Sequence, residues 1–302
     1  MSLLSRLFVV LALGTQIMGL ATHETPLLDP SLSAREVALS QASFSDHHFN
    51  NMLRNPASIA STRGVAMQAT EYLGISYSAV AFVHNHFNTS FGVHYVGSSV
   101  DTMMRSVVDT NDNGPPLVKE TDDIIPYEYH AISFSTAKML GNFSFGGGFR
   151  HKTLILDNQT NTNIEGMAGI IYTIVDEFSV AVSITNYIFD QEASNDLQGT
   201  EPILSTGLKF SPTKKVKFFM GVIKNNNEIS THPTFHTSLE YYMNDYLPIR
   251  MGLDHNRYTL GTGLYLDPFE IDIALAQSRD PIIDHQLTIG FSYGLEEKNN
   301  LY

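Results

Sequence analysis

Apolar and polar side chains alternate with a period of two from about residue 64 to the end of the chain. The segment Phe269-Glu-Ile-Asp-Ile-Ala-Leu-Ala places its large apolar side chains on one face and Glu270 and Asp272 on the other. Period two belongs to a β-strand, whereas a helix would distribute these residues around its axis. The same alternation returns in residues 178–185, 216–222, 235–241 and 287–293. The chain is therefore predicted to be all-β after residue 63.

The alternating segments number about fourteen, and many have the 9 to 11 residues that a tilted strand needs to cross a bilayer. Their predicted centres lie near Met67, Ala79, Val93, Phe134, Gly146, Gly169, Val182, Leu208, Phe219, Leu239, Met251, Gly263, Ile273 and Ile289. The even-numbered connections are tight, and the odd-numbered ones include the longest loops, expected over residues 103–126 and 191–202. An even strand count with short turns on one rim and long loops on the other is typical of a transmembrane antiparallel β-barrel.

Composition favours a barrel whose apolar face meets lipid. Hydrophobic residues make up 43% of the 302 residues and charged residues only 16%, whereas soluble domains carry about 25% charged residues. A secreted soluble β protein also alternates and stays open as an alternative. Tyrosines at the ends of the apolar faces predict an interfacial girdle. They are Tyr72, Tyr95, Tyr129, Tyr187, Tyr258 and Tyr293.

If the apolar face points outward, a set of charged and polar side chains must project into the lumen. It comprises Lys209, Lys217, His236, Glu240, Arg250, Glu270 and Asp272. Glu240 and Arg250 lie on strands that are adjacent in sequence and are expected to pair, because a closed interior disfavours a lone charge. The alternative is a solvated pore wall without a specific function.

The N-terminal part of the chain divides into two segments before the barrel. Arg6, the apolar run 7–13 and the small residues ending at Ala21 are typical of a secretory signal peptide, predicted over residues 1–21. A hatch or plug segment is predicted over residues 22–62, the barrel over 63–295 and a tail over 296–302. Within the hatch, Ser33 and Glu36 have the spacing of a capping box that opens a short helix.

Three segments, in this order, resemble the FadL/PorV-type outer-membrane proteins. They are Ser33-Ala-Arg-Glu-Val-Ala-Leu, Asn55-Pro-Ala-Ser-Ile-Ala and His285-Gln-Leu-Thr-Ile-Gly-Phe-Ser-Tyr-Gly-Leu. The resemblance implies a fourteen-stranded barrel plugged by its N-terminal segment. It also implies that Asn55, Pro56 and Ala57 belong to the plug, although a turn that only launches the first strand would use the same residues.

Transport members of this family pass hydrophobic compounds inward, often by lateral exit through the wall. The resemblance therefore implies a bacterial outer-membrane protein that passes hydrophobic small molecules. PorV-type members instead serve the type IX secretion system, so an interaction or shuttle component is the alternative, as is a structural protein without transport. The expected partners are membrane lipid, the outer-membrane assembly machinery, a hydrophobic cargo and, in the alternative, secretion-system proteins.

Other functional classes find little support in the sequence. A formal net charge of -13 without basic clusters argues against nucleic acid. The chain has no cysteine, and neither His47-His48 nor His84-x-His86 has a carboxylate at a suitable spacing, so no metal or other cofactor is expected. The glycines of residues 146–148 lie in a strand pattern, which favours close backbone approach or a bend over a phosphate loop. No Gly-x-Ser-x-Gly segment is present, and an enzyme is not expected.

Overall fold

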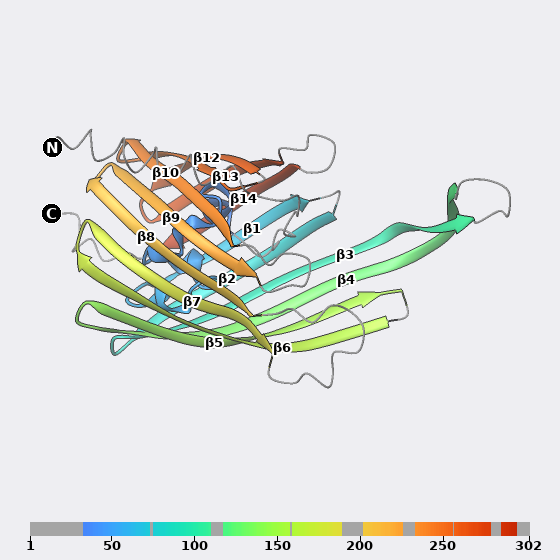
Figure 1. Ribbon diagram of the computed structural model, residues 1–302, viewed down its shortest axis with the longest axis horizontal. Helices are drawn as coiled ribbons and strands as arrows, with labels where there is room; N and C mark the ends of the chain where they lie inside the picture. The colour runs from blue at the N-terminus through green and yellow to red at the C-terminus, as the bar shows by residue number, and fades with distance from the viewer. Residues whose placement is uncertain are drawn as a thin grey trace.

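The computed structural model describes residues 33–72, 75–109, 117–157, 159–188, 202–225, 233–255, 257–278 and 285–294. Fourteen antiparallel strands form one closed barrel, and β1 pairs with both β2 and β14 to complete the ring. Neighbours in the ring are also neighbours in sequence, so the barrel is a simple up-and-down meander (Figure 1). The predicted fold, an all-β barrel of about fourteen strands with a short N-terminal helical segment, is confirmed.

Each predicted strand centre falls within one observed strand. The strands are β1 Gly64–Tyr72, β2 Ile75–His86, β3 Thr89–Asp109, β4 Leu117–Leu140, β5 Phe143–Leu156, β6 Gln159–Val175, β7 Phe178–Ile188, β8 Ile203–Thr213, β9 Val216–Asn225, β10 Thr234–Asn244, β11 Leu247–Leu253, β12 Arg257–Leu266, β13 Phe269–Ser278 and β14 His285–Gly294. The second, fourth, sixth, eighth, tenth and twelfth connections are two residues long, as predicted for one rim.

The prediction of a loop over residues 103–126 is wrong. β3 and β4 continue as a paired ribbon, with Val107 opposite Lys119 and Val108 opposite Val118, and the ribbon projects far past the other strands (Figure 1). β-branched residues favour a paired strand over a loop. The loop expected over residues 191–202 lies almost wholly outside the described residues.

The outer surface of the barrel is apolar and the inner surface is polar or small. On β13, Ile271, Ile273 and Leu275 are 41%, 43% and 53% exposed, while Glu270 and Asp272 between them are buried. A soluble barrel would have the opposite arrangement, since it buries its apolar face. No helix among the described residues is long and apolar enough to cross a membrane. The exposed apolar strand faces therefore match a lipid-facing wall.

The predicted tyrosine girdle is correct in part. Tyr95, Tyr187 and Tyr258 are about half exposed on the outer face. The prediction for Tyr129 is wrong. Its side chain faces the lumen and packs edge-on against Tyr77, with ring centroids 6.3 Å apart. The reason is strand parity, because Tyr129 shares its face with the buried Ala131. The side chain of Tyr72 lies outside the described residues.

Residues 33–62, hereafter the inner segment, lie inside the barrel (blue in Figure 1). The segment contains the short helix α2 and three 3-10 turns. Their bounds are α2 Ala34–Ala38, η2 Ala42–Ser45, η3 Phe49–Asn51 and η4 Pro56–Ile59. Ser33 and Glu36 form the expected capping box. The helix ends at Ala38. It cannot continue, because Ser40 and Gln41 adopt positive φ angles of 48° and 61°, which a right-handed helix excludes.

The lipid-facing wall predicts a position-dependent cost for a buried charge. Ile273→Arg, in the middle of β13, should destabilise the folded barrel in lipid vesicles by roughly 2–4 kcal/mol, whereas Leu266→Arg at the turn end of β12 should cost about 0–1 kcal/mol. Urea unfolding followed by circular dichroism and heat-dependent gel mobility measures both. Equal costs at the two positions would contradict a membrane-spanning wall.

Candidate functional site

A cluster of eight charged side chains, buried except for the partly exposed Lys209 and Lys217, joins the inner segment to the barrel wall. Four are cations and four are anions, so their formal charges cancel. The inner segment supplies Arg35 and Asp46, and the wall supplies Lys209, Lys217, Glu240, Arg250, Glu270 and Asp272. This ion cluster contains all the predicted lumen-facing polar residues except His236.

Arg35 pairs directly with a carboxylate of the wall. Its guanidinium donates two hydrogen bonds to the Glu240 carboxylate, from Nε to Oε1 at 3.1 Å and from Nη2 to Oε2 at 2.9 Å, and Nη2 also donates to Asp46 Oδ2 at 2.9 Å. A two-pronged contact of this kind fixes orientation as well as charge. The ring of Phe219 lies 5.9 Å below the guanidinium carbon. Arg35 thereby fixes α2 against β10 and β9.

Arg250 continues the cluster across the wall. Its Nε donates to Glu240 Oε1 at 2.7 Å, which is the expected pair between adjacent strands. Its Nη2 donates to Glu270 Oε1 at 2.9 Å, and Nη1 bonds Asp272, both on β13. The intervening strand β12 leaves room through Gly263, where an added Cβ would lie 3.1 Å from Arg250 Nη1. A glycine is therefore needed where one arginine spans three strands.

Asp46 is the anionic counterpart on the inner segment. Lys209 Nζ lies 3.0 Å from Oδ1, and Lys217 Nζ lies 3.6 Å from Oδ2. Burial by itself raises the pKa of the Asp46 carboxyl, but Lys209, Lys217 and Arg35 hold that pKa well below its usual range. The carboxylate is therefore charged at neutral pH. It pairs with Lys209 and shares Lys217 with Glu240.

The histidines of the inner segment are neutral hydrogen-bonding groups. Burial lowers the pKa of His47 and the pKa of His48 to about 4. His47 Nε2 lies 2.8 Å from Ser144 Oγ of β5, and His48 Nδ1 accepts from the Asn50 amide. His236 on the wall contacts the inner segment through the Ser40 carbonyl, 2.7 Å from its Nδ1. Among the described residues, no group of three or more histidines and carboxylates is arranged to hold a metal ion.

Inward-facing glycines form the second set of contacts between wall and inner segment. A Cβ on Gly207 would lie 2.6 Å from the Phe44 ring, and one on Gly221 would lie 2.9 Å from it. Added Cβ atoms at Gly92 and Gly261 would overlap Met52 and Ala38. Since real Cβ atoms do not approach so closely, only glycine lets the segment lie this near the wall.

Asn55, Pro56 and Ala57 lie fully buried in this arrangement. The Asn55 amide stays within the inner segment, because Nδ2 donates to the Phe44 carbonyl at 3.0 Å and Oδ1 accepts from the Ala57 amide at 3.0 Å. The wall contact is steric: a Cβ on Gly169 would overlap the Asn55 side chain, and one on Gly146 would overlap the Pro56–Ala57 backbone. Close backbone approach at Gly146, expected from the sequence, is confirmed.

The side of the inner segment that faces β1–β5 is apolar. Phe49, Met52, Ile59 and Ala60 pack there in one cluster. The wall residues of the same cluster are Ala66, Ala81, Val83 and Ala137. The ion cluster lies on β8–β13, so the segment has one ionic side and one apolar side.

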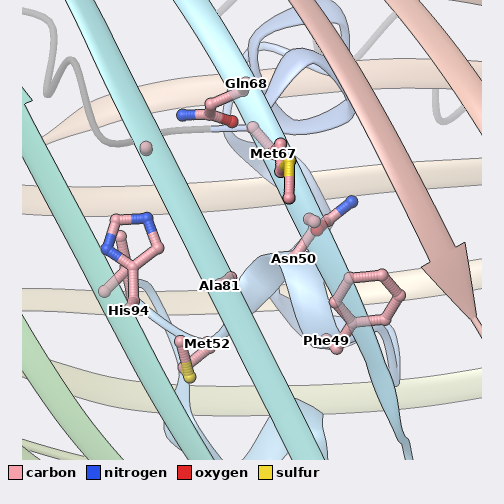
Figure 2. Close-up of a pocket in the computed structure, with 11 residues that line it drawn as sticks. Phe49, Asn50, Met52, Met67, Gln68, Ala81 and His94 are labelled. Atoms are coloured by element: carbon pink, nitrogen blue, oxygen red, sulfur yellow. The ribbon is translucent and has the colours of Figure 1, made fainter.

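A small cavity of about 20 Å³, enough for a water molecule, lies between the apolar side and β1–β3 (Figure 2). Phe49, Asn50 and Met52 line it from the inner segment, and Gln68 and His94 line it from the wall. Its remaining lining residues are Ser33, Leu53, Ala66, Met67, Ala79 and Ala81. The cavity lining therefore combines an aromatic ring and thioethers with four side chains able to form hydrogen bonds.

Sequence reasoning missed Arg35, Asp46 and the cavity. A usable signal was present, since residues 33–60 carry only four charged side chains, and an isolated charge in a segment destined for a barrel interior needs a partner. The alternation does not identify the partner of either charge on the wall. Glu240 is 205 residues from Arg35, and Lys209 is 163 residues from Asp46.

Comparison with solved structures identifies the architecture. The toluene transporter TodX of Pseudomonas putida superposes with a TM-score of 0.63 at 11% identity, over 88% of this chain and 98% of that one. The monoaromatic hydrocarbon channel CymD gives 0.55 at 11% identity, over 85% and 96%. The protein has the TodX fold. The resemblance to FadL-type barrels is thus confirmed for the fold, although no protein-family model and no curated protein sequence matches the chain.

In this barrel with the TodX fold, the glycine contacts predict that alanine substitution is costly at one position and tolerated at the next. Gly146→Ala should displace the Pro56–Ala57 backbone and cost about 1–3 kcal/mol, as overpacking does. Gly147→Ala is the matched control, because its Cβ would contact only the Met167 carbonyl at 3.7 Å. Limited proteolysis of the inner segment measures the effect, and equal protection in both variants would contradict the packing.

The ion cluster predicts that replacing one of its charged side chains with a neutral one strongly weakens docking of the inner segment. Asp46→Asn leaves Lys209 and Lys217 short of an anion and should weaken docking of the inner segment by roughly 3–5 kcal/mol. Hydrogen exchange of residues 33–62 reports the docking, and gel mobility reports the barrel. Asp245→Asn, in an exposed turn, is the control; similar exchange in the two variants would show that the cluster does not hold the segment.

Proposed function

We propose that the protein passes small hydrophobic compounds across the bacterial outer membrane. The observation that carries this proposal is the barrel with an apolar outer surface and an internally docked N-terminal segment, in the fold of the toluene transporter TodX and the hydrocarbon channel CymD. An exported chain needs a signal peptide, and we assign that role to residues 1–21, which lie outside the described residues.

The inner segment is the plug in this proposal. Strands all around the ring contact it, from β3 to β14, and it fills the lumen with buried side chains. Open passage of polar solutes is thereby prevented, while the apolar side next to β1–β5 offers an environment that a hydrophobic compound can enter. Asn55, Pro56 and Ala57 keep the plug in shape, because Asn55 caps the turn that Pro56 begins.

Lateral exit through the wall, implied by the family resemblance, finds no gap between neighbouring strands in the part of the chain that the structure describes. Each strand is hydrogen-bonded to both neighbours around the ring. On β3, pairing is continuous from Thr89 to Gly97 towards both β2 and β4. The proposed passage therefore begins inside the lumen, along the plug.

The plug predicts the outcome of uptake measurements in cells. Outer membranes that contain the protein should take up radiolabelled toluene several-fold faster than those without it. Asn55→Ala with Pro56→Ala should loosen the plug and admit small polar solutes, measured as increased sensitivity to an antibiotic that the intact membrane excludes. Gel mobility must show a folded barrel in both cases.

Two results would overturn this assignment. Unchanged permeability of the double variant with a folded barrel would remove the plug role. Absence of any toluene uptake by the wild-type protein would remove the transport role, and copurification of an exported protein in that case would favour the PorV-like interaction role, for which the projecting β3–β4 ribbon offers a surface.

A further inference from the structure

An aromatic ladder runs along the outer face of β2 towards the short-turn rim, which is the rim opposite the projecting β3–β4 ribbon (Figure 1). Its rings follow one another in the order Phe82, His84, His86 and Phe87. Neighbouring ring centroids are 6.4, 6.4 and 4.2 Å apart. All four side chains are exposed, so packing of the interior does not account for them. The ladder contains the His84-x-His86 pair, which takes no part in the plug or the ion cluster.

The turn at the end of the ladder carries a residue that its backbone disfavours. Phe87 and Asn88 form the β2–β3 turn with positive φ angles of 49° and 60°. A two-residue turn of this kind favours asparagine, aspartate or glycine, and a bulky side chain at positive φ is strained. The Phe87 side chain is 86% exposed, so packing within the protein offsets little of that strain. An aromatic ring at the boundary between a membrane and water is stabilised by that boundary.

Basic side chains extend the ladder across the neighbouring strands. Thr89 of β3 is opposite His86, and Lys138 of β4 is opposite Thr89, so the three residues form one row on the outer face. Adjacent strands lie about 4.8 Å apart, which places the backbones of His86 and Lys138 roughly 10 Å from each other. Lys138 is exposed, and so is Arg63, which immediately precedes β1. We call Arg63, His84, His86 and Lys138 the basic patch.

The arc of the barrel from β1 to β5 has no acidic residue near this rim on its outer face or in its turns, among the described residues. The acidic residues of these strands and their connections, Glu71, Glu128 and Asp157, all lie near the opposite rim. Elsewhere on the short-turn rim, the β6–β7, β10–β11 and β12–β13 turns carry acidic residues at positions 176–177, 245 and 267. The formal net charge of the chain is -13. The basic patch is therefore a local positive surface on an acidic protein.

A phospholipid has the same order of chemistry as this part of the wall. Phe82 and Phe91 lie deeper in the wall than His86 and are 50% and 52% exposed, so they suit acyl chains. At the level of the rim, lysine pairs with a phosphate and an imidazole donates at least one N–H to it. An anionic headgroup carries no cation for the patch to repel, whereas a choline headgroup does. Short turns are the periplasmic ends of such barrels, so the patch meets lipid of the periplasmic leaflet.

We propose that the basic patch binds a phospholipid with an anionic headgroup, whose phosphate contacts His84, His86 and Lys138. The acyl chains of this lipid lie against Phe82 and Phe91. The inference does not depend on transport, because it rests on the membrane-spanning wall and on the distribution of charge around its rim. It gives the barrel one preferred lipid contact, at β2–β4, on the same side of the ring as the apolar side of the inner segment.

Native mass spectrometry of the intact protein in detergent tests the lipid preference. Phosphatidylglycerol should bind about fivefold more tightly than phosphatidylcholine with the same acyl chains, the ratio expected when one basic side chain faces an anionic lipid. The variant His84→Gln/His86→Gln/Lys138→Gln should remove that preference. Lys214→Gln/Lys215→Gln is the matched control, because it removes two lysines from the β8–β9 turn of the same rim, and it should keep the preference.

A fluorescent probe tests the position of the bound lipid. The chain has no tryptophan, so Phe87→Trp introduces a single one beside the basic patch. Tyr246→Trp introduces one in the β10–β11 turn of the same rim, where the native side chain is 60% exposed. In vesicles, brominated phosphatidylglycerol should quench Phe87→Trp more strongly than brominated phosphatidylcholine at the same mole fraction. It should not do so for Tyr246→Trp.

Equal binding of the two lipids by the wild-type protein would overturn the proposal. A preference lost equally in the Lys214→Gln/Lys215→Gln variant would show general attraction of anionic lipid to a basic rim and would overturn the site at β2–β4. A phosphatidylglycerol preference of the same size at Phe87→Trp and Tyr246→Trp would overturn it as well. Heat-dependent gel mobility must show a folded barrel in every variant, and toluene uptake in cells remains a separate measurement.

Discussion

The contact between the Arg35 guanidinium and the Glu240 carboxylate is the constraint around which the interior is arranged. Both side chains are almost wholly buried, so neither charge is tolerated without the other. Glu240 is also the partner of Arg250, and Arg250 holds the two carboxylates of β13. One arginine of the inner segment is thus connected to three strands of the wall, β10, β11 and β13, and the position of α2 depends on the register of β10 to β13.

Such a cluster specifies a position more than it adds stability. Ion pairs taken out of water often contribute little net free energy, because the desolvation cost offsets the attraction, whereas breaking one is expensive. The six wall charges cancel among themselves, and the inner segment adds a matched pair, Arg35 and Asp46, that interleaves with them. A shifted inner segment would separate buried opposite charges, so the cluster selects one docking position among many that simple apolar packing would allow.

The inward-facing glycines leave the space that the inner segment needs beside the wall. The wall approaches the inner segment at Gly92, Gly146, Gly169 and Gly207, where no other residue leaves enough space. A barrel of fourteen strands has a lumen that side chains from the wall cannot fill by themselves. A segment of about thirty residues occupies this lumen and leaves an apolar side, and the proposed passage of hydrophobic compounds rests on that combination.

The sequence by itself determined the barrel. Period-two alternation fixes which side chains face in and which face out, because a one-residue slip would move every apolar residue to the wrong side, and the two-residue turns fix the neighbours. Strand positions and the inward set from Lys209 to Asp272 followed from this local rule. Two predictions are wrong: Tyr129 has the same inward parity as the buried Ala131, and residues 103–109 and 117–126 continue the paired β3–β4 ribbon where a loop is expected.

Only the tertiary structure decided the partners of the inner segment. Arg35 and Glu240 are 205 residues apart, and alternation states that Glu240 faces inward without stating what it meets there. The shape of the cavity beside Met52 is equally non-local, because it is bounded by three strands and a turn whose contacts arise after the barrel closes. Local periodicity specifies orientation, whereas charge pairing and steric fit between distant segments require the closed ring.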